Sequence, residues 1–95
     1  MIKRIVKLEI DPMKRDEFIR LFEKINKQIV DFDGCISVDL LADIHANQIF
    51  LTYSTWLSKK HLDKYRNSTF FKENWKKVKP LFVNKPLAWS VREIL

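Results

Sequence analysis

Glycine, cysteine and proline are scarce in this sequence, with one glycine, one cysteine and three prolines among 95 residues. So little glycine leaves no room for a flexible linker or for a phosphate-binding glycine loop. The lone Cys35 cannot form an internal disulfide. Two isolated histidines and one cysteine also make no recognisable set of metal ligands. We therefore expect neither a metal ion nor a nucleotide or flavin cofactor in this chain.

Long apolar runs are missing as well. Residues 1–7 mix apolar with basic side chains and contain no uninterrupted apolar stretch of the length that signal peptides have. No other segment approaches the roughly 20 consecutive apolar residues that cross a bilayer. We therefore expect a cytoplasmic protein without membrane association.

Positive charge is in excess, with a formal net charge of +6. The excess lies between residues 58 and 85, where nine basic residues are accompanied only by Asp63 and Glu73. Such a block can bind nucleic acid, an anionic ligand or lipid head groups. A lysine-rich helix face exposed to water is more common, and we favour that interpretation.

The pattern of apolar residues predicts four strands and two helical regions in one domain spanning residues 1–95. Asp11 and Pro12 begin an amphipathic helix of about five turns. A second helical region begins at Ser58 and is interrupted at Asn67-Ser68. Apolar alternation predicts strands over residues 2–10, 35–43, 48–56 and 86–95. The order is β-α-β-β-α-β, which predicts an α+β, ferredoxin-like fold with a four-stranded antiparallel sheet.

The third predicted strand is apolar on both of its faces. Phe50 and Trp56 lie on one face, and Ile49, Leu51 and Tyr53 lie on the other. A strand that is covered by helices on one side only is usually polar on its second face. We therefore expect a second copy of the chain to cover that face, in a homodimer.

Alternation also assigns faces in the second and fourth predicted strands. In the second strand one face is expected to carry Ile36, Val38, Leu40 and Ala42. In the last strand Trp89 and Val91 share a face.

The predicted topology is shared with RNA-recognition domains, which stack bases on aromatic residues of their inner strands. Such domains begin the third strand with a basic residue and include a glycine there. Residues 48–56 have neither feature, and only Tyr53 could stack on the open face. We therefore expect no nucleic-acid partner.

Several segments along almost the whole chain resemble the antibiotic biosynthesis monooxygenase family of dimeric α/β barrels. They are Phe18-Ile19-Arg20-Leu21-Phe22, Phe32-Asp33-Gly34-Cys35, residues 50–59, Tyr65-Arg66-Asn67-Ser68 and Phe70-Phe71-Lys72. The resemblance implies two sheets that pack through their non-helical faces and a separate pocket in each protomer between sheet and helices. It specifies the reaction poorly, since the family includes cofactor-free quinone-forming oxygenases, haem-degrading enzymes and signal-molecule isomerases.

The resemblance suggests four catalytic candidates. Trp56 lies where the cofactor-free oxygenases have a pocket tryptophan, although it can equally be a core residue that closes the strand. Thr52 replaces an asparagine of some of those oxygenases. Tyr65 can orient a substrate through its phenol, or it can simply pack on the sheet with its hydroxyl in water. His61, one turn before Tyr65, is a possible proton carrier, but a histidine between basic neighbours is more often an exposed helix residue.

The walls of the implied pocket are expected to be mainly apolar. Candidate substrate-binding residues are Val6, Phe22, Phe71 and Trp75, with Trp89 as a further aromatic wall and Asn74 as a polar group at the rim. An aromatic stripe at helical spacing is, however, more often part of the core than of a ligand site.

Two functions fit this sequence. The first is a cofactor-free monooxygenase or related oxidoreductase that holds a small aromatic or quinol-like molecule in a dry pocket and stabilises the negative charge that develops on it. The second is a non-catalytic dimer that binds a small molecule in the same pocket. A pocket without a base of shifted pKa would favour the second.

Overall fold

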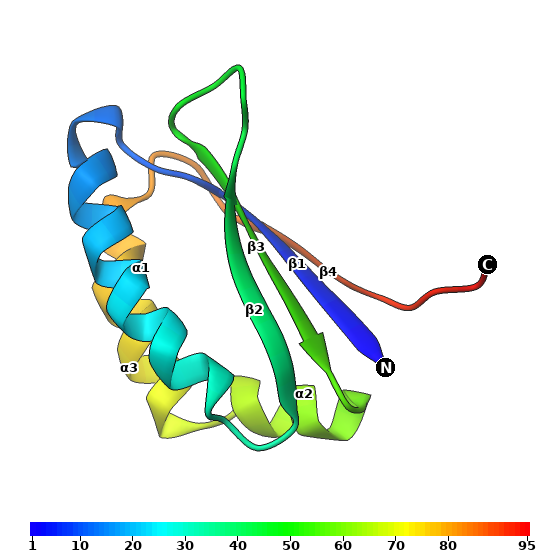
Figure 1. Cartoon of the computed structure of the whole chain (residues 1–95). Coiled ribbons are helices and arrows are strands. Elements are labelled where there is room, and N and C mark those ends of the chain that lie inside the picture. The colour runs from blue at the N-terminus through cyan, green and yellow to red at the C-terminus, as the bar shows by residue number, and fades with distance from the viewer.

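A computed structural model describes all 95 residues as one four-stranded antiparallel sheet covered by helices on one face (Figure 1). The chain forms β1 (Ile2–Glu9), a 3-10 turn η1 (Pro12–Lys14), α1 (Arg15–Val30), β2 (Cys35–Ala42), β3 (Ile49–Trp56), α2 (Lys59–Arg66), α3 (Thr69–Val78), a second 3-10 turn η2 (Lys79–Leu81) and β4 (Leu87–Val91). The strands are arranged in the order β2-β3-β1-β4. The predicted ferredoxin-like topology is therefore confirmed. The last strand is shorter than predicted, since it ends at Val91.

Side-chain caps fix where the helices begin. Asp11 caps η1, which leads into α1: its carboxylate accepts the N–H of Met13 at 3.0 Å, and Pro12 is the first residue of that turn. Ser58 and Ser68 cap α2 and α3 by accepting the N–H groups of His61 and Phe71. Each cap satisfies a backbone donor that has no partner inside its helix. The break between α2 and α3 thus places two short helices, instead of one long one, over the sheet.

The hydrophobic core lies between α1 and the helix-facing side of the sheet. Its largest fully buried side chains are Trp56, Phe18, Phe50, Ile10 and Leu62. The rings of Phe18 and Phe50 are 4.9 Å apart, which joins α1 to β3. None of the helices has the length and apolar character needed to cross a membrane.

The face assignment of Ile36 was wrong. The β2–β3 register shifts between Cys35 and Ser37, so one additional residue is accommodated there. Such a bulge reverses the side-chain alternation on one side of it. Ile36 is consequently 44% exposed, whereas Val38 is buried and Cys35 packs against the core.

The assignment of Trp89 to the pocket wall was also wrong. Trp89 pairs with Ile5 in the β1–β4 register and lies on the face away from the helices, 47% exposed. Its neighbours Ala88 and Ser90 pair with Val6 and Arg4 and lie on the helix side. The strand thus turns its small residues toward the helices and its large ones outward.

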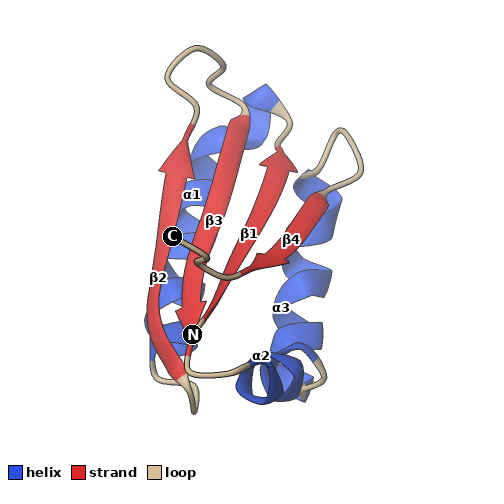
Figure 2. Cartoon of the chain, turned by 90° about the vertical axis from the view of Figure 1, so that its right-hand side faces the viewer, coloured by secondary structure: helices blue, strands red, loops and turns tan.

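The open face of the sheet, which faces the viewer in Figure 2, carries two rows of side chains across the strands. Pairing in the register places Asp39, Tyr53, Ile5 and Trp89 in one row and Leu41, Leu51, Lys7 and Leu87 in the next. We call these residues the open-face rows. Leu41, Leu87 and Trp89 are between 45% and 50% exposed, which is unusual for large apolar side chains on one continuous surface.

Gly34 is required where the chain passes from α1 to β2. Its φ is +84°, and a Cβ built on it would lie 2.3 Å from atoms of the His61 ring. Gly34→Ala should therefore lower the free energy of unfolding by about 2 kcal/mol or more, because a strained left-handed backbone is combined with a clash. Urea denaturation checks this, and an alanine variant as stable as the wild type would contradict it.

Candidate functional site

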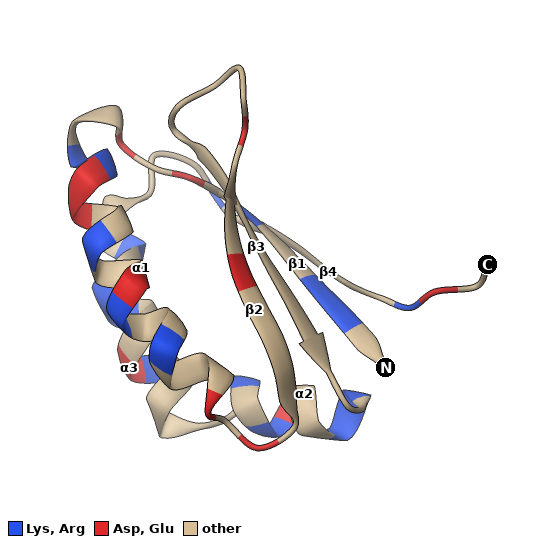
Figure 3. Cartoon of the chain, viewed as in Figure 1, with Lys and Arg blue, Asp and Glu red and all other residues tan.

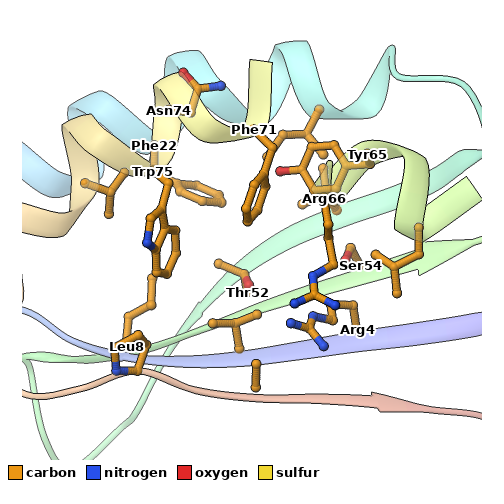
Figure 4. Close-up of a pocket in the computed structure, with 17 residues that line it drawn as sticks. Arg4, Leu8, Phe22, Thr52, Ser54, Tyr65, Arg66, Phe71, Asn74 and Trp75 are labelled. Atoms are coloured by element: carbon orange, nitrogen blue, oxygen red, sulfur yellow. The ribbon is translucent and has the colours of Figure 1, made fainter. Parts of the chain in front are cut away.

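A cavity of about 340 Å³ lies between the sheet and the helices (Figure 4). Its volume is in the range of small-molecule sites, which run from about 300 to 1,000 Å³. Of its 17 lining residues, 11 are hydrophobic. The floor comes from all four strands, and the roof comes from α1, α2 and α3.

Seven of the nine candidate site residues border this cavity. They are Val6, Phe22, Thr52, Tyr65, Phe71, Asn74 and Trp75. The two others, Trp56 and His61, do not line it.

Trp56 is a fully buried core residue. Its indole ring stacks on the Tyr65 ring, with centroids 4.8 Å apart. The indole N–H donates to the hydroxyl oxygen of Ser54 at 3.0 Å. This donor is therefore engaged within the protein, and Trp56 contacts two residues that line the cavity, Tyr65 and Ser54.

His61 packs behind the pocket, against the turn at Gly34. Its Nδ1 lies 2.7 Å from the Ser58 hydroxyl, which also caps α2. A ring in this position holds the first turn of α2 and does not reach the cavity. His61 is thus not among the residues that line the cavity.

Tyr65 brings a neutral hydroxyl to the cavity. Its ring lies among Trp56, Phe32 and Phe71, and Figure 4 shows its oxygen directed toward Phe71. Burial, with a smaller contribution from nearby Cys35, raises the pKa of this phenol well above its ordinary value. The hydroxyl makes no hydrogen bond within the chain, so it is free to donate to a ligand.

The raised pKa of Tyr65 predicts how stability depends on pH. The folded chain holds the phenolic proton more tightly than the unfolded chain, whose tyrosine pKa is 10.0. The contribution of protonated Tyr65 to the free energy of unfolding is fully present below pH 10 and is lost as the pH rises further. The free energy of unfolding should therefore fall above pH 10, and the Tyr65→Phe variant should fall less steeply. Urea denaturation between pH 9 and 11 measures this, and an equal dependence of the free energy of unfolding on pH in the two proteins would contradict it.

Two hydroxyl-bearing residues of β3 lie in the cavity floor. Thr52 pairs with Val6 on β1, and Ser54 pairs with Arg4. Figure 4 shows Thr52 near the middle of the cavity and Ser54 toward the end where the arginines lie. Both hydroxyls can donate or accept a hydrogen bond with a ligand.

Arg4 and Arg66 were not predicted as site residues, yet both line the cavity. Arg4 comes from β1, where its Nη1 donates to the Ser90 hydroxyl at 2.9 Å. Arg66 reaches in from the end of α2, and the two guanidinium groups come together in Figure 4. Burial, and then the positive charge of Arg66, lower the pKa of Arg4. The signal that could have found Arg4 was its position on an otherwise apolar strand face.

The rest of the basic block is exposed, mostly on the helices, as expected for a solvated surface (Figure 3). Some of its lysines pair with acidic residues, as Lys59 does with Asp63 at 2.6 Å and Lys76 with Glu73 at 3.7 Å. Arg66 forms no ion pair and differs from the lysines of the block because it borders the cavity.

Asn74 borders the cavity without presenting its amide to it. The residue is 9% exposed, and its Nδ2 has no hydrogen-bond partner. Figure 4 shows the amide directed toward α1 and away from the cavity. Asn74 therefore contributes to the wall more than to ligand recognition.

The lining contains no aspartate, glutamate, histidine, cysteine or lysine. It thus offers no side chain of the kinds that usually ligate metals and none that acts as a general base near neutral pH. The polar groups that it does offer are the hydroxyls of Thr52, Ser54 and Tyr65, the Trp75 indole and two guanidiniums. This combination suits a flat ligand with negatively polarised oxygen atoms.

Residues 1–77 match the family model described as antibiotic biosynthesis monooxygenase. Many solved structures share the fold, and three of them illustrate the similarity. A conserved protein from Methanosarcina mazei Go1 has a TM-score of 0.91 and 21% identity, covering 97% of this chain and 91% of its own. A candidate antibiotic biosynthesis monooxygenase from Bordetella bronchiseptica has a TM-score of 0.88 and 22% identity, with coverages of 99% and 97%. One from Nitrosomonas europaea has a TM-score of 0.90 and 14% identity, with both chains fully covered. A search of curated proteins gave no match.

Proposed function

Because this chain belongs to the antibiotic biosynthesis monooxygenase family, we propose that it oxidises a small, flat aromatic or quinol-like substrate with dioxygen and without a bound cofactor. The observation that carries the proposal is the pocket itself. Phe22, Phe71 and Trp75 supply apolar walls, and Tyr65 supplies a neutral donor to an aromatic ring oxygen.

The chemistry requires little from the protein beyond binding and charge stabilisation. A hydroquinone that gives two electrons and two protons to dioxygen yields a quinone and hydrogen peroxide. An anthrone whose CH₂ group becomes a carbonyl takes one oxygen atom from dioxygen, and the other leaves as water. In both reactions the ionised substrate is the electron donor, so the pocket must favour the anion and exclude water.

We further propose that the working unit is a homodimer. The open-face rows would pack against the same rows of a second copy, as the relatives' barrel arrangement implies. The exposed apolar side chains of Leu41, Leu87 and Trp89 support this proposal, since they would otherwise remain in water. The single cysteine is compatible with a reducing cytoplasm, where we place the dimer.

One observation favours the alternative of a non-catalytic binding dimer. The lining provides no general base, so proton removal from a weakly acidic substrate would have no protein acceptor. The binding dimer would use the same pocket and the same polar contacts. The two functions differ only in whether dioxygen is consumed.

Oxygen uptake over a panel of hydroquinones and anthrones, with no added flavin, metal or haem, tests the oxygenase proposal. Tyr65→Phe should lower the rate by about tenfold, because one neutral hydrogen bond to the substrate oxygen is lost. Phe70→Leu, which changes an aromatic neighbour of Tyr65 outside the cavity lining, is the control and should stay within about twofold. No uptake by the wild type on any member of the panel would leave the binding dimer as the better account.

A further inference from the structure

The end of the cavity where β1 meets α2 carries two positive charges and no negative one. Arg4 and Arg66 both line it, and the lining contains no carboxylate. The acidic residues that pair with basic ones do so elsewhere, as Glu93 with Lys3 and Asp33 with Lys64. Two guanidiniums brought together without a counter-charge repel each other. An anion placed between them would relieve that repulsion.

The neighbouring groups are arranged as the surroundings of an anion would be. Arg4 is held from one side by the Ser90 hydroxyl at 2.9 Å, which leaves its other N–H groups for a ligand. The Ser54 hydroxyl, already accepting the Trp56 N–H, has its own proton to donate. Figure 4 shows Ser54 close to both arginines. Guanidinium groups are well suited to bind oxyanions through paired, charge-assisted hydrogen bonds.

We propose that the ligand is bound as an oxyanion, with its negatively charged oxygen between Arg4 and Arg66 and its aromatic body extending over Thr52 toward Phe71 and Trp75. This inference deepens the proposed function, and its pocket is the same one. The charge can be permanent, as on an aromatic carboxylate, or can form on binding, as on an acidic phenol. In the second case the arginine pair replaces the missing base, because nearby positive charge favours the ionised phenol and the proton leaves to solvent.

Three fully oxidised probes of similar shape test the proposal without any turnover. Anthraquinone-2-carboxylate is permanently anionic, 2-hydroxyanthraquinone ionises with a change in its visible spectrum, and 2-methoxyanthraquinone stays neutral. The wild type should bind the anionic probes about tenfold to 100-fold more tightly than the neutral one, as charge-assisted hydrogen bonds imply. It should also shift the ionisation of the bound hydroxy compound to lower pH. The relative affinities of the carboxylate and the hydroxy compound show which source of charge the site prefers.

The variants separate the arginine pair from general surface charge. Arg66 is exposed at the end of α2, so Arg66→Gln should fold normally. It should bring the affinities for anionic and neutral probes within about threefold of each other, and Arg4→Gln should do the same. Lys60→Gln removes an equal charge from an exposed, unpaired position of α2 and should leave the discrimination intact. Arg66→Lys should retain part of it.

Equal binding of the neutral and anionic probes by the wild type would overturn the proposal, and so would discrimination that survives in both glutamine variants. Because the probes are already oxidised, this outcome does not depend on oxygen uptake. A chain that discriminates between the probes but consumes no dioxygen would keep the anion site and lose the oxygenase function.

Discussion

Replacing Leu51 with aspartate is expected to dissociate the proposed homodimer or to unfold it. Leu51 occupies the centre of the open-face rows, between Leu41 and Lys7. In a dimer that packs these rows together, an aspartate there would be buried without a partner. The penalty for an unpaired buried charge is several kcal/mol, so the dimer dissociation constant should rise by about 1,000-fold or more.

Light scattering at low micromolar concentration measures this effect. The wild type should have twice the chain mass, and Leu51→Asp should be monomeric or unfolded. Met13→Asp is the matched control, because Met13 is 95% exposed in η1, on the helical side of the molecule. A wild-type protein that is monomeric at this concentration would contradict the proposed dimeric barrel.

Trp56→Ala should cause the largest loss of stability of any single aromatic substitution near the site. Trp56 is 0% exposed and stacks on Tyr65, while its N–H satisfies Ser54. Truncating a buried tryptophan leaves a large cavity and typically costs about 3–5 kcal/mol. The free energy of unfolding from urea denaturation, at a fixed chain concentration, should fall by that amount.

Trp56→Phe separates packing from hydrogen bonding at the same position. It keeps an aromatic ring and loses the N–H, so the destabilisation should be about 1–2 kcal/mol. Its turnover should change less than that of Tyr65→Phe, because the indole does not line the cavity. A large loss of turnover in a stably folded Trp56→Phe variant would instead place the indole N–H on the substrate.

The fold could be predicted because its signals are local and repeated. Each element could be identified from its own segment of sequence. Alternation identifies β1 and β3, helical spacing from Phe18 to Ile29 identifies α1, and a serine cap marks the start of α2. The error at Ile36 has a different origin. The bulge between Cys35 and Ser37 contains no glycine or proline that would mark it in the sequence. Strict alternation therefore assigns Ile36 to the wrong face of the sheet.

The lining of the cavity could be predicted where strand alternation or helical spacing determines which side chains face it. Val6 and Thr52 follow from alternation, and Phe71 and Trp75 follow from helical spacing. Trp56 lies on the same face of β3 as Thr52, but alternation does not show that its ring and N–H are taken up by Tyr65 and Ser54. Arg66 was hidden among the exposed lysines of the basic block, because charge density in sequence does not reveal which side chain borders the cavity.

Two features of the pocket determine which ligand it can bind. Tyr65 stays protonated because burial raises its pKa, so it acts as a donor over the whole working range of pH. Arg4 and Arg66 bring two guanidinium groups to one end, and no acidic residue of the lining pairs with them. Together they make a site that is apolar along its length and positive at one end, which is the arrangement that an ionised aromatic ligand needs.

A crystal structure with 2-hydroxyanthraquinone bound tests the central claim most directly, because it locates the ligand and its charged oxygen at once. The account predicts the ring system inside the cavity, against Phe71 and Trp75, with its 2-oxygen within hydrogen-bonding distance of the Arg4 or Arg66 guanidinium. A ligand bound on the open face of the sheet, or one in the cavity with that oxygen directed away from both arginines, would contradict it.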